Sequence, residues 1–272
     1  MKPHVTSNVH KVRPPACAGR FYPADPTELL QTVKNLLASA KTPDGPAPKA
    51  IIAPHAGYDY SGPVAASAYA LLQSARDSIK RVVLIGPAHY AEFDGLATSS
   101  ADAFSTPLGT VSLDKNAIVQ LRFLPQVKVF DQAHEPEHCL EVHLPFLQTV
   151  LDQFALVPLL VGNAAEEAVA DVLAALWDGP ETRIVVSSDL SHYFDYPTAG
   201  TLDQTTARAI EALQAEELDG DQACGFRPIL GLLHLARARG LRSSCIDLRN
   251  SGDTAGRRDR VVGYGAFVFV DQ

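Results

Sequence analysis

Short apolar runs alternate along this chain with segments of helical periodicity. The apolar runs are Ala50–Ala53, Arg81–Gly86, Ala155–Val161, Arg183–Ser187, Leu241–Asp247 and Val261–Val270. Such continuous apolar runs are typical of strands buried on both faces. The segments whose apolar residues fall on one helical face are Gly62–Leu72, Lys115–Arg122, Leu144–Leu151, Glu166–Leu176, Leu202–Leu213 and Pro228–Arg239. Strands that alternate with helices predict an α/β fold with a central, twisted, mainly parallel sheet and helices on both faces.

The remaining segments predict how this sheet is bounded. A first helix is expected to begin near Pro26, because Asp25 suits the N-cap and proline suits the first helical turn. The segment Leu96–Leu113 is less regular and is expected to contribute antiparallel edge strands. Residues 1–15 form an irregular or extended arm, and residues 41–48 (KTPDGPAP) form a loop. Neither segment separates two domains, so residues 1–272 are predicted to fold as one domain.

Composition and charge narrow the range of partners. Hydrophobic residues make up 46% of the 272 residues, enough for a sizeable core, and the formal net charge is −8. An acidic surface repels phosphate backbones and anionic lipids, so neither nucleic acid nor a membrane is expected as a partner. The chain begins without an apolar signal segment, and no apolar run approaches the roughly 18 residues that span a bilayer. We therefore expect a cytoplasmic protein whose cysteines stay reduced.

Polar side chains follow three of the apolar runs, at the point where each predicted strand ends. His55 follows IIAP, His89 follows VVLIGP, and Asp189 and His192 follow IVVSS. In open α/β sheets, ligands bind in the crevice at the carboxyl ends of the strands. One histidine after a strand is usually a loop residue, but three at one predicted edge favour a site. Two imidazoles and an anionic ligand bind a divalent transition metal, so His55 and His89 are the best candidate pair, with Asp189 or a cysteine as third ligand.

Cys224 has the most suggestive setting of the four cysteines. It precedes the helix predicted from Pro228, and a helix N-terminus favours the thiolate. A small buried residue is an equally good interpretation, since packing is the commonest fate of a free cysteine. For Cys17, Cys139 and Cys245 packing is the favoured interpretation.

A second histidine-rich segment lies in the middle of the chain. His134 to His138 (HEPEH) matches the H-x-x-E-H pattern of inverted zinc peptidases, which requires both histidines on one helical face. Pro136 disfavours that helix, so a peptidase is not expected. Glu141 and His143 precede the helix predicted at Leu144, and they line the same crevice or cap that helix. We favour a site role for His143.

Eight blocks of sequence together resemble a known family. They are AGRFYPADP, IIAPHAGYDYSGP, LIGPAHY, EHCLEVHLPFLQ, PLLVG, VVSSDLSHY, CGFRPI and NSGD. They occur in the order seen in Memo-family proteins, whose bacterial and archaeal members are often called AmmeMemoRadiSam system protein B. The resemblance covers the chain from about residue 13 to residue 270, which makes it more specific than any single motif.

The resemblance implies a fold like that of the class III, extradiol-type non-haem iron dioxygenases. It also implies that His55, His89 and Cys224 are metal ligands, that Asp189 and His192 lie beside them, and that His143 is another pocket residue. The dioxygenases use two histidines and a glutamate, whereas a cysteine, or Asp189, takes the third position here. A thiolate is softer and shifts metal preference towards copper, zinc or iron of a different redox range. Ring cleavage therefore does not follow from the fold.

Three functions follow as hypotheses. The first is a metal-dependent redox enzyme with Fe(II) or copper, in which His192 is the general base and Asp189 orients it or completes the metal shell; zinc is a further possible ion for the site. The second is a non-catalytic module that binds a small molecule or a peptide. The third is one component of a system whose other members are an Amme-type protein and a radical SAM protein. This chain has no C-x-x-x-C-x-x-C motif, so it is not the radical SAM member.

Overall fold

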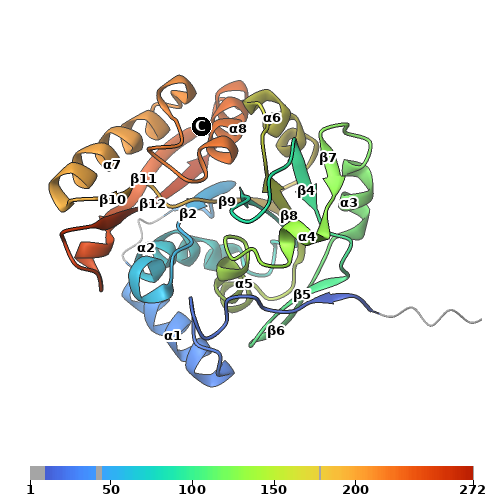
Figure 1. Cartoon of the computed structure of the whole chain (residues 1–272). Helices are drawn as coiled ribbons and strands as arrows, with labels where there is room; N and C mark the ends of the chain where they lie inside the picture. The colour runs from blue at the N-terminus through green and yellow to red at the C-terminus, as the bar shows by residue number, and fades with distance from the viewer. Residues whose placement is uncertain (1–9, 41–44, 178, 272) are drawn as a thin grey trace, which may run out of the picture.

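The computed structural model describes residues 10–40, 45–177 and 179–271. Within those residues, nine strands form one large sheet, in the order β10-β12-β2-β9-β3-β8-β4-β7 with β11 paired to β12 (Figure 1). Its strands are β2 (Ala50–Ala53), β3 (Arg81–Pro87), β4 (Leu96–Thr98), β7 (Val127–Val129), β8 (Ala155–Val161), β9 (Thr182–Ser187), β10 (His192–Phe194), β11 (Arg242–Asn250) and β12 (Val261–Val270).

The centre of this sheet is parallel, and its flanks are largely antiparallel. Strands β2, β9, β3 and β8 run side by side in the same direction, whereas β12 and β4 join them in the opposite one. The four central strands are almost wholly buried, which explains their continuous apolar sequences. The predicted α/β fold with a mainly parallel sheet is confirmed.

Helices cover both faces of the sheet. They are α1 (Pro26–Ser39), α2 (Tyr58–Ala70), α3 (Lys115–Leu121), α4 (Asp131–His134), α5 (Leu144–Val150), α6 (Glu166–Ala175), α7 (Tyr196–Glu211) and α8 (Phe226–Arg239), with short 3-10 turns at Leu71–Ala75, Glu141–His143, Ala215–Glu217 and Ser251–Asp253. Helices α1, α2 and α5 pack together on one face, and α6, α7 and α8 lie on the other (Figure 1). One contiguous apolar core fills the space between the layers.

The first residues of two helices show that an N-cap, as well as the apolar periodicity, determines where a helix begins. Helix α1 begins at Pro26 as predicted, because the Asp25 carboxylate accepts hydrogen bonds from the backbone N–H groups of residues 27 and 28. Helix α7 begins at Tyr196, six residues before the predicted Leu202. Asp195 caps it by accepting from the Thr198 N–H, a signal that the apolar spacing does not contain.

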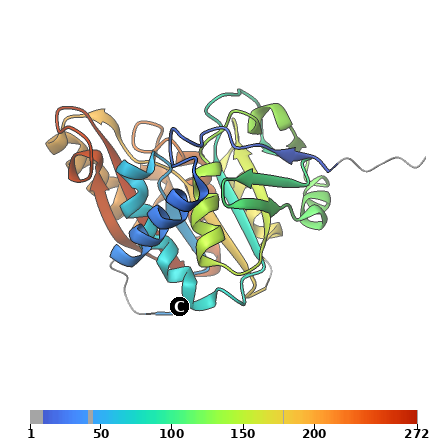
Figure 2. The same cartoon turned by 90° about the horizontal axis from the view of Figure 1, so that it is seen from below.

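Two expectations about the edges need correction. Only β4 of the segment Leu96–Leu113 joins the large sheet. Strands β5 (Ala103–Thr106) and β6 (Gly109–Ser112) instead form a hairpin in a separate three-stranded sheet with β1 (Val12–Arg13). Figure 2 shows β1, in blue, beside this green hairpin. The arm at residues 1–15 is therefore partly a strand, while its residues 1–9, like residues 41–44 of the predicted loop, lie outside the described residues.

Among the helices of the described residues, no helix is both long enough and apolar enough to span a bilayer.

Candidate functional site

A pocket of about 610 Å³ lies where three central strands end. His55 lies two residues beyond β2, His89 two residues beyond β3 and Asp189 two residues beyond β9. These strands are neighbours and parallel, so their carboxyl ends meet at one edge of the sheet. The pocket is lined by Phe21, His55, Ala56, Gly57, His89, His138, Asp189, His192, Tyr193, Phe194, Gly220, Asp221, Cys224 and Val262.

Three imidazoles converge in this pocket. His55, His89 and His138 each offer a ligand atom, and these atoms lie within 4.8 Å of one another. The His55 ring meets the other two edge-on, with centroids 5.1 Å from His89 and 5.5 Å from His138, and the latter two rings stack at 4.8 Å. Nitrogen atoms at such spacing can share one transition-metal ion.

Hydrogen bonds fix the orientation of the His55 ring. Its Nδ1 lies 2.7 Å from the Ser187 hydroxyl oxygen, and that hydroxyl donates its only proton to the Cys139 carbonyl at 2.7 Å. Ser187 must therefore accept from His55, which places the imidazole proton on Nδ1. The unprotonated Nε2 then faces the pocket, as a metal ligand must.

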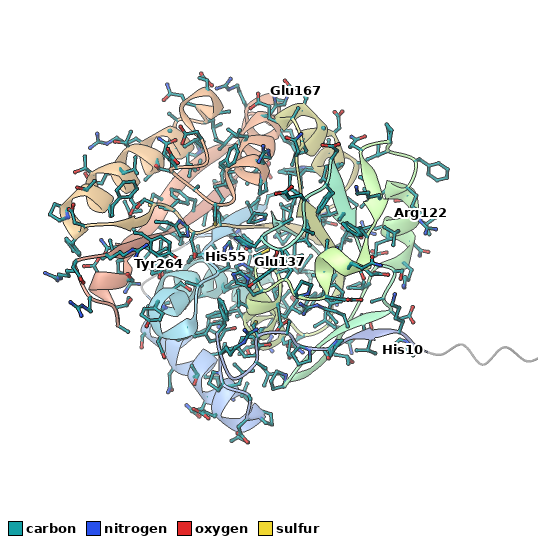
Figure 3. The ribbon with its side chains drawn as sticks, in the orientation of Figure 1. His10, His55, Arg122, Glu137, Glu167 and Tyr264 are labelled. Atoms are coloured by element: carbon teal, nitrogen blue, oxygen red, sulfur yellow. The ribbon has the colours of Figure 1, made fainter. Side chains whose placement is uncertain are left out.

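The carboxylate of Glu137 lies against both of the other imidazoles, those of His89 and His138. One carboxylate oxygen lies 2.9 Å from His89 Nδ1, and the other accepts from the His89 backbone N–H at 2.7 Å. The carboxylate also accepts from the backbone N–H groups of His138 and Cys139. His138 Nδ1 lies 3.2 Å from the same oxygen but does not satisfy hydrogen-bond geometry. Figure 3 labels Glu137 beside His55 near the centre of the molecule.

Burial keeps the innermost imidazole neutral. Desolvation lowers the pKa of His55 well below its usual value, and the neighbouring His89 and His138 lower it further. Glu137 behaves in the opposite sense. Although burial raises its pKa, the nearby His138 and His89 side chains and the hydrogen bond from the His89 backbone N–H outweigh that effect and hold the carboxyl ionised. The pocket therefore has a neutral His55 imidazole at its centre and a buried negative charge on Glu137.

Cys224 reaches this cluster from the loop before α8. Its Sγ lies 3.3 Å from His55 Nε2 and 3.6 Å from the Asp189 carbonyl oxygen. Burial raises the pKa of the thiol to about 12, and the Asp189 charge adds to this. The expectation that the helix start favours the thiolate is wrong for the metal-free chain, because desolvation is the larger effect. A bound metal would displace the thiol proton, since metal ligation deprotonates cysteine.

Asp189 faces the main chain rather than the imidazoles. Its Oδ1 accepts from the backbone N–H groups of His55 at 2.7 Å and Ala56 at 3.3 Å. Burial raises the pKa of this carboxyl, and the hydrogen bond from His55 counteracts the rise. In the described part of the chain no hydrogen bond joins Asp189 to the His192 ring. The carboxylate thus positions the turn that carries His55.

His192 and His143, both expected at the site, occupy different places. His192 lies on β10 and lines the pocket, next to Tyr193. His143 is not among the lining residues. The 3-10 turn at Glu141–His143 directs it into the core, where its Nδ1 lies 2.8 Å from the Tyr69 hydroxyl. Burial lowers the pKa of His143 to about 3.

Glu137 and His138 are the site residues that the sequence did not predict. The HEPEH segment was judged only as a helical peptidase motif, and α4 indeed ends at His134, before Pro136. The chain then turns and carries His138 into the pocket through a loop. The sequence held one usable signal for these two residues. A glutamate that becomes buried needs a partner for its charge, and Glu137 has His138 directly beside it.

Cys17, Cys245 and Glu141 lie away from the pocket. Cys139 does not line it but lies behind it, where its Sγ, a nitrogen of His89 and a carboxylate oxygen of Glu137 lie within 4.8 Å of one another and form a second group that can hold a metal. Cys17 and Cys139 are fully buried and Cys245 is half-buried, in agreement with packing roles. Glu141, one of the residues expected to line the crevice or cap a helix, does neither. It is buried against the N-terminal arm, where it forms an ion pair with Arg13.

Comparison with known proteins extends over nearly the whole chain. Residues 13–268 match the family model described as "Memo-like protein". A MEMO1 family protein of Aquifex aeolicus is 34% identical over 271 residues, covering 96% of this chain and 100% of the relative. A MEMO1 family protein of Methanopyrus kandleri is 34% identical over 281 residues, covering 94% of this chain and 98% of the relative.

One solved structure shares the fold. It is the crystal structure of an uncharacterised protein from Escherichia coli K12, with a TM-score of 0.50 and 13% sequence identity. The match covers 80% of this chain and 98% of that one. At this identity the likeness concerns the fold alone.

Proposed function

Because this chain belongs to the Memo-like protein family, we propose that it is a metal-dependent redox enzyme whose ion is held by His55 and His89. Cys224 is the proposed third ligand, and His138 is the competing donor for that position. The observation that carries this proposal is the convergence of three imidazoles within 4.8 Å, with the Nδ1 atoms of His55 and His89 already engaged. Such engagement aims the remaining nitrogens at an ion.

The charge balance of the pocket supports a cation. Glu137 is buried and ionised, yet within the described residues its ion-pair partners are only the two histidines. A buried carboxylate requires a compensating charge. A divalent ion bound through the imidazoles would supply it without protonating them.

The donor set favours a redox-active metal. Imidazole suits iron, copper and zinc, and a thiolate favours softer ions among them. We propose Fe(II) as the resident ion, with copper and zinc as the alternatives. When bound, iron or copper would supply a centre that exchanges electrons, whereas zinc would only polarise a bound oxygen atom.

The protein's own residues have separable roles in this proposal. His192, which lines the same pocket, takes the proton from a substrate hydroxyl, since histidine is the commonest general base. Asp189 holds the backbone of His55 and thereby its ring. His143 contacts Tyr69 behind the pocket, so we assign it a positioning role rather than contact with substrate.

Metal retention and oxygen uptake test the proposal in order. The chain is loaded anaerobically with Fe(II), desalted and compared with the variants H55A and C224S. Near one iron per wild-type chain, with almost none in H55A, is the expected result. Oxygen consumption is then measured with catechol and other phenols. Uptake no greater than that of free iron would contradict dioxygen chemistry, and failure to retain iron, copper or zinc would contradict the metal site.

A binding module is the second candidate, and one observation favours it. Three aromatic side chains in and beside the pocket are unusually exposed, at 58% for Tyr90, 60% for Tyr193 and 38% for Phe194. Exposed aromatics are common at ligand-binding surfaces. A metal-free chain that retains a specific small molecule or peptide in this pocket would favour this candidate.

Membership of a system with Amme-type and radical SAM proteins remains a prediction from the family resemblance. Co-purification of the tagged chain with such partners is its test, and an isolated chain with full activity would count against an obligatory complex.

A further inference from the structure

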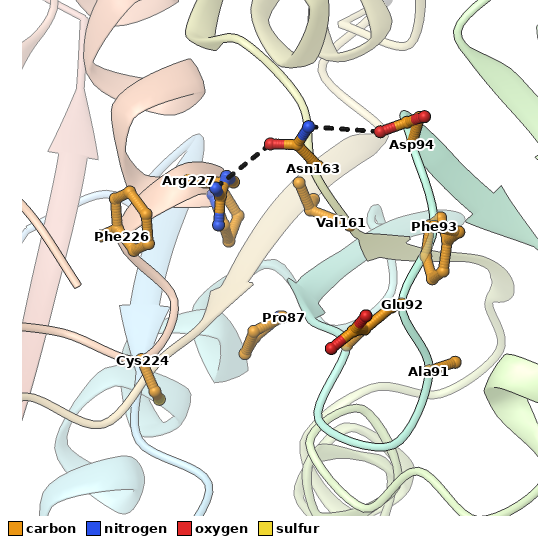
Figure 4. A pocket seen from close by; sticks show the side chains of 13 residues that line it. Pro87, Ala91, Glu92, Phe93, Asp94, Val161, Asn163, Cys224, Phe226 and Arg227 are labelled. Carbon is orange, nitrogen blue, oxygen red and sulfur yellow. Dashed lines mark hydrogen bonds between the residues drawn. The ribbon is translucent and has the colours of Figure 1, made fainter.

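A second pocket opens beside the metal pocket, at the same edge of the sheet. Its volume is about 610 Å³, and Cys224 lines both pockets. Its walls come from the segment after β3, the end of β8 and the start of α8 (Figure 4). A molecule bound there can therefore extend past Cys224 towards the imidazoles.

Arg227 is the cation of this second pocket. It is half-buried, and among the ion pairs of the described chain it has no carboxylate partner. Its guanidinium donates to the Asn163 side-chain oxygen at 3.3 Å, and Asn163 in turn donates to Asp94 at 3.2 Å (Figure 4). The guanidinium also lies 4.7 Å from the centroid of the Phe226 ring.

These contacts restrain the guanidinium while leaving most of its donors free. An arginine side chain has five N–H donors in a planar fork, and only one bond to protein is made here. A fork held in place by stacking and one amide contact loses less entropy when it binds a carboxylate through two parallel hydrogen bonds. Arg227 is thus prepared for a planar anion.

The rest of the pocket limits the ligand to a single negative charge. Glu92 and Asp94 lie on another wall, where Asp94 accepts from Asn163, and Phe93, Val161 and Phe226 supply apolar surface (Figure 4). A second carboxylate near Glu92 would be repelled, because like charges in a pocket disfavour one another. An apolar or aromatic body joined to one carboxylate matches this arrangement.

We propose that the second pocket binds the carboxylate of a monocarboxylate substrate, and that Arg227 is the specificity-determining residue. The far end of the substrate enters the metal pocket past Cys224. This inference rests on the proposed function for the identity of the reacting end, whereas recognition of the carboxylate by Arg227 does not depend on a bound metal.

Binding of a matched pair of probes to the metal-free full chain tests the proposal. The probes are 3-phenylpropionate and 3-phenylpropionamide, which have the same apolar body and nearly the same shape but carry a charged carboxylate and a neutral amide, and their dissociation constants are measured by ligand-observed NMR titration. We expect the acid to bind about tenfold more tightly than the amide, as for a charge-assisted hydrogen-bonded pair. The variant R227Q should bind both probes equally weakly.

Controls separate this pocket from the metal site. R239Q removes an arginine from the far end of the same helix and should keep the tenfold preference. R227M keeps the aliphatic stem over Phe226 and serves if R227Q fails to fold. R227Q and R227M should retain Fe(II) like the wild type.

Equal binding of acid and amide by the wild type would overturn the proposal, as would a preference that survives in both Arg227 variants. If the wild-type chain prefers the acid over the amide but retains no metal, only the proposed function is contradicted, and carboxylate recognition by Arg227 stands.

Discussion

Two buried glutamates on one short segment, Glu137 and Glu141, have opposite surroundings. Glu141 accepts from the backbone N–H groups of residues 16 and 17 and from the Tyr22 hydroxyl, and it forms an ion pair with Arg13. All of these partners lie in the segment that precedes α1. Glu137 accepts from His89 and from its own loop, and among the described residues its ion-pair partners are the histidines His89 and His138.

The difference separates a carboxylate whose charge is already balanced within the fold from one that we propose supports a metal site. Burial opposes ionisation of both groups, and the pKa of each is nevertheless held low, by Arg13 for Glu141 and by the histidines for Glu137. The charge of Glu141 is balanced by a permanent cation, so that cluster is complete. The charge of Glu137 is balanced only if its histidines gain a proton or bind a metal, so that cluster is prepared for a ligand.

The largest expected effect concerns stability at the arm. E141Q leaves the buried Arg13 guanidinium without its carboxylate, and breaking a buried ion pair in this way costs about 3–5 kcal/mol. Urea unfolding of the metal-free chain measures this loss. The exposed Glu135 provides a matched control, since E135Q should change stability by less than about 0.5 kcal/mol. Equal stability of E141Q and E135Q would contradict the structural role of Glu141, because the ion pair with Arg13 would then not stabilise the fold.

The next effect concerns metal affinity. E137Q removes the charge that orients His89, and losing such a partner typically weakens metal binding about 10–100-fold. Competition with a chelator measures the affinity for Fe(II). E141Q, assayed under conditions where it is folded, should bind metal like the wild type. If E141Q lost as much affinity as E137Q, the two glutamates would not have separate roles.

The third prediction concerns the pH dependence of the free energy of unfolding, which we attribute in part to His134, a neighbour of Arg13. His134 donates from Nε2 to the Ala97 carbonyl, its own carbonyl accepts from Arg13, and burial lowers its pKa to about 4. The unfolded chain, with a pKa near 6.5, binds this proton first as pH falls. Stability from this group is therefore complete above about pH 6.5 and is lost towards pH 4, at about 1.4 kcal/mol per pH unit. H134Q should reduce the slope of unfolding free energy against pH by that amount, and an unchanged slope would refute the assignment.

The smallest effect concerns the tautomer of His55. S187A removes the hydroxyl that accepts from Nδ1, so the ring is free to protonate Nε2 instead. Loss of one hydrogen bond predicts a metal affinity about three- to tenfold lower, less than for E137Q. S191A is the control, because the Ser191 hydroxyl is buried without a hydrogen-bond partner in the described structure. A larger loss in S191A than in S187A would exclude this role for Ser187.

The sequence predicted the sheet well because its central strands are buried on both faces. The apolar runs at Ala50–Ala53, Ala155–Val161 and Val261–Val270 coincide with strands β2, β8 and β12 to the residue. The same feature located His55 and His89, since both directly follow such runs. The sequence did not predict that β5 and β6 form a separate sheet with β1, because β1 is only two residues long and carries Arg13, whose buried ion-pair partner Glu141 is distant in sequence.

Loop residues were harder to predict for a physical reason. His138 reaches the pocket through an irregular loop, so no periodicity or strand end marks it. His143 and Glu141 are near neighbours in sequence, yet a 3-10 turn sends them away from the pocket. Local spacing determines which face of a helix or strand a residue occupies, but in loops tertiary contacts such as those of Glu137 decide.

Anomalous diffraction from crystals loaded with Fe(II), and separately with copper and zinc, tests the central claim most directly. We expect one anomalous peak in the pocket that His55 and His89 line, about 2.0–2.2 Å from Nε2 of His55 and from the facing nitrogen of His89, with Cys224 or His138 beside it. Absence of a peak in the pocket for all three metals, or a peak that contacts neither histidine, would contradict it.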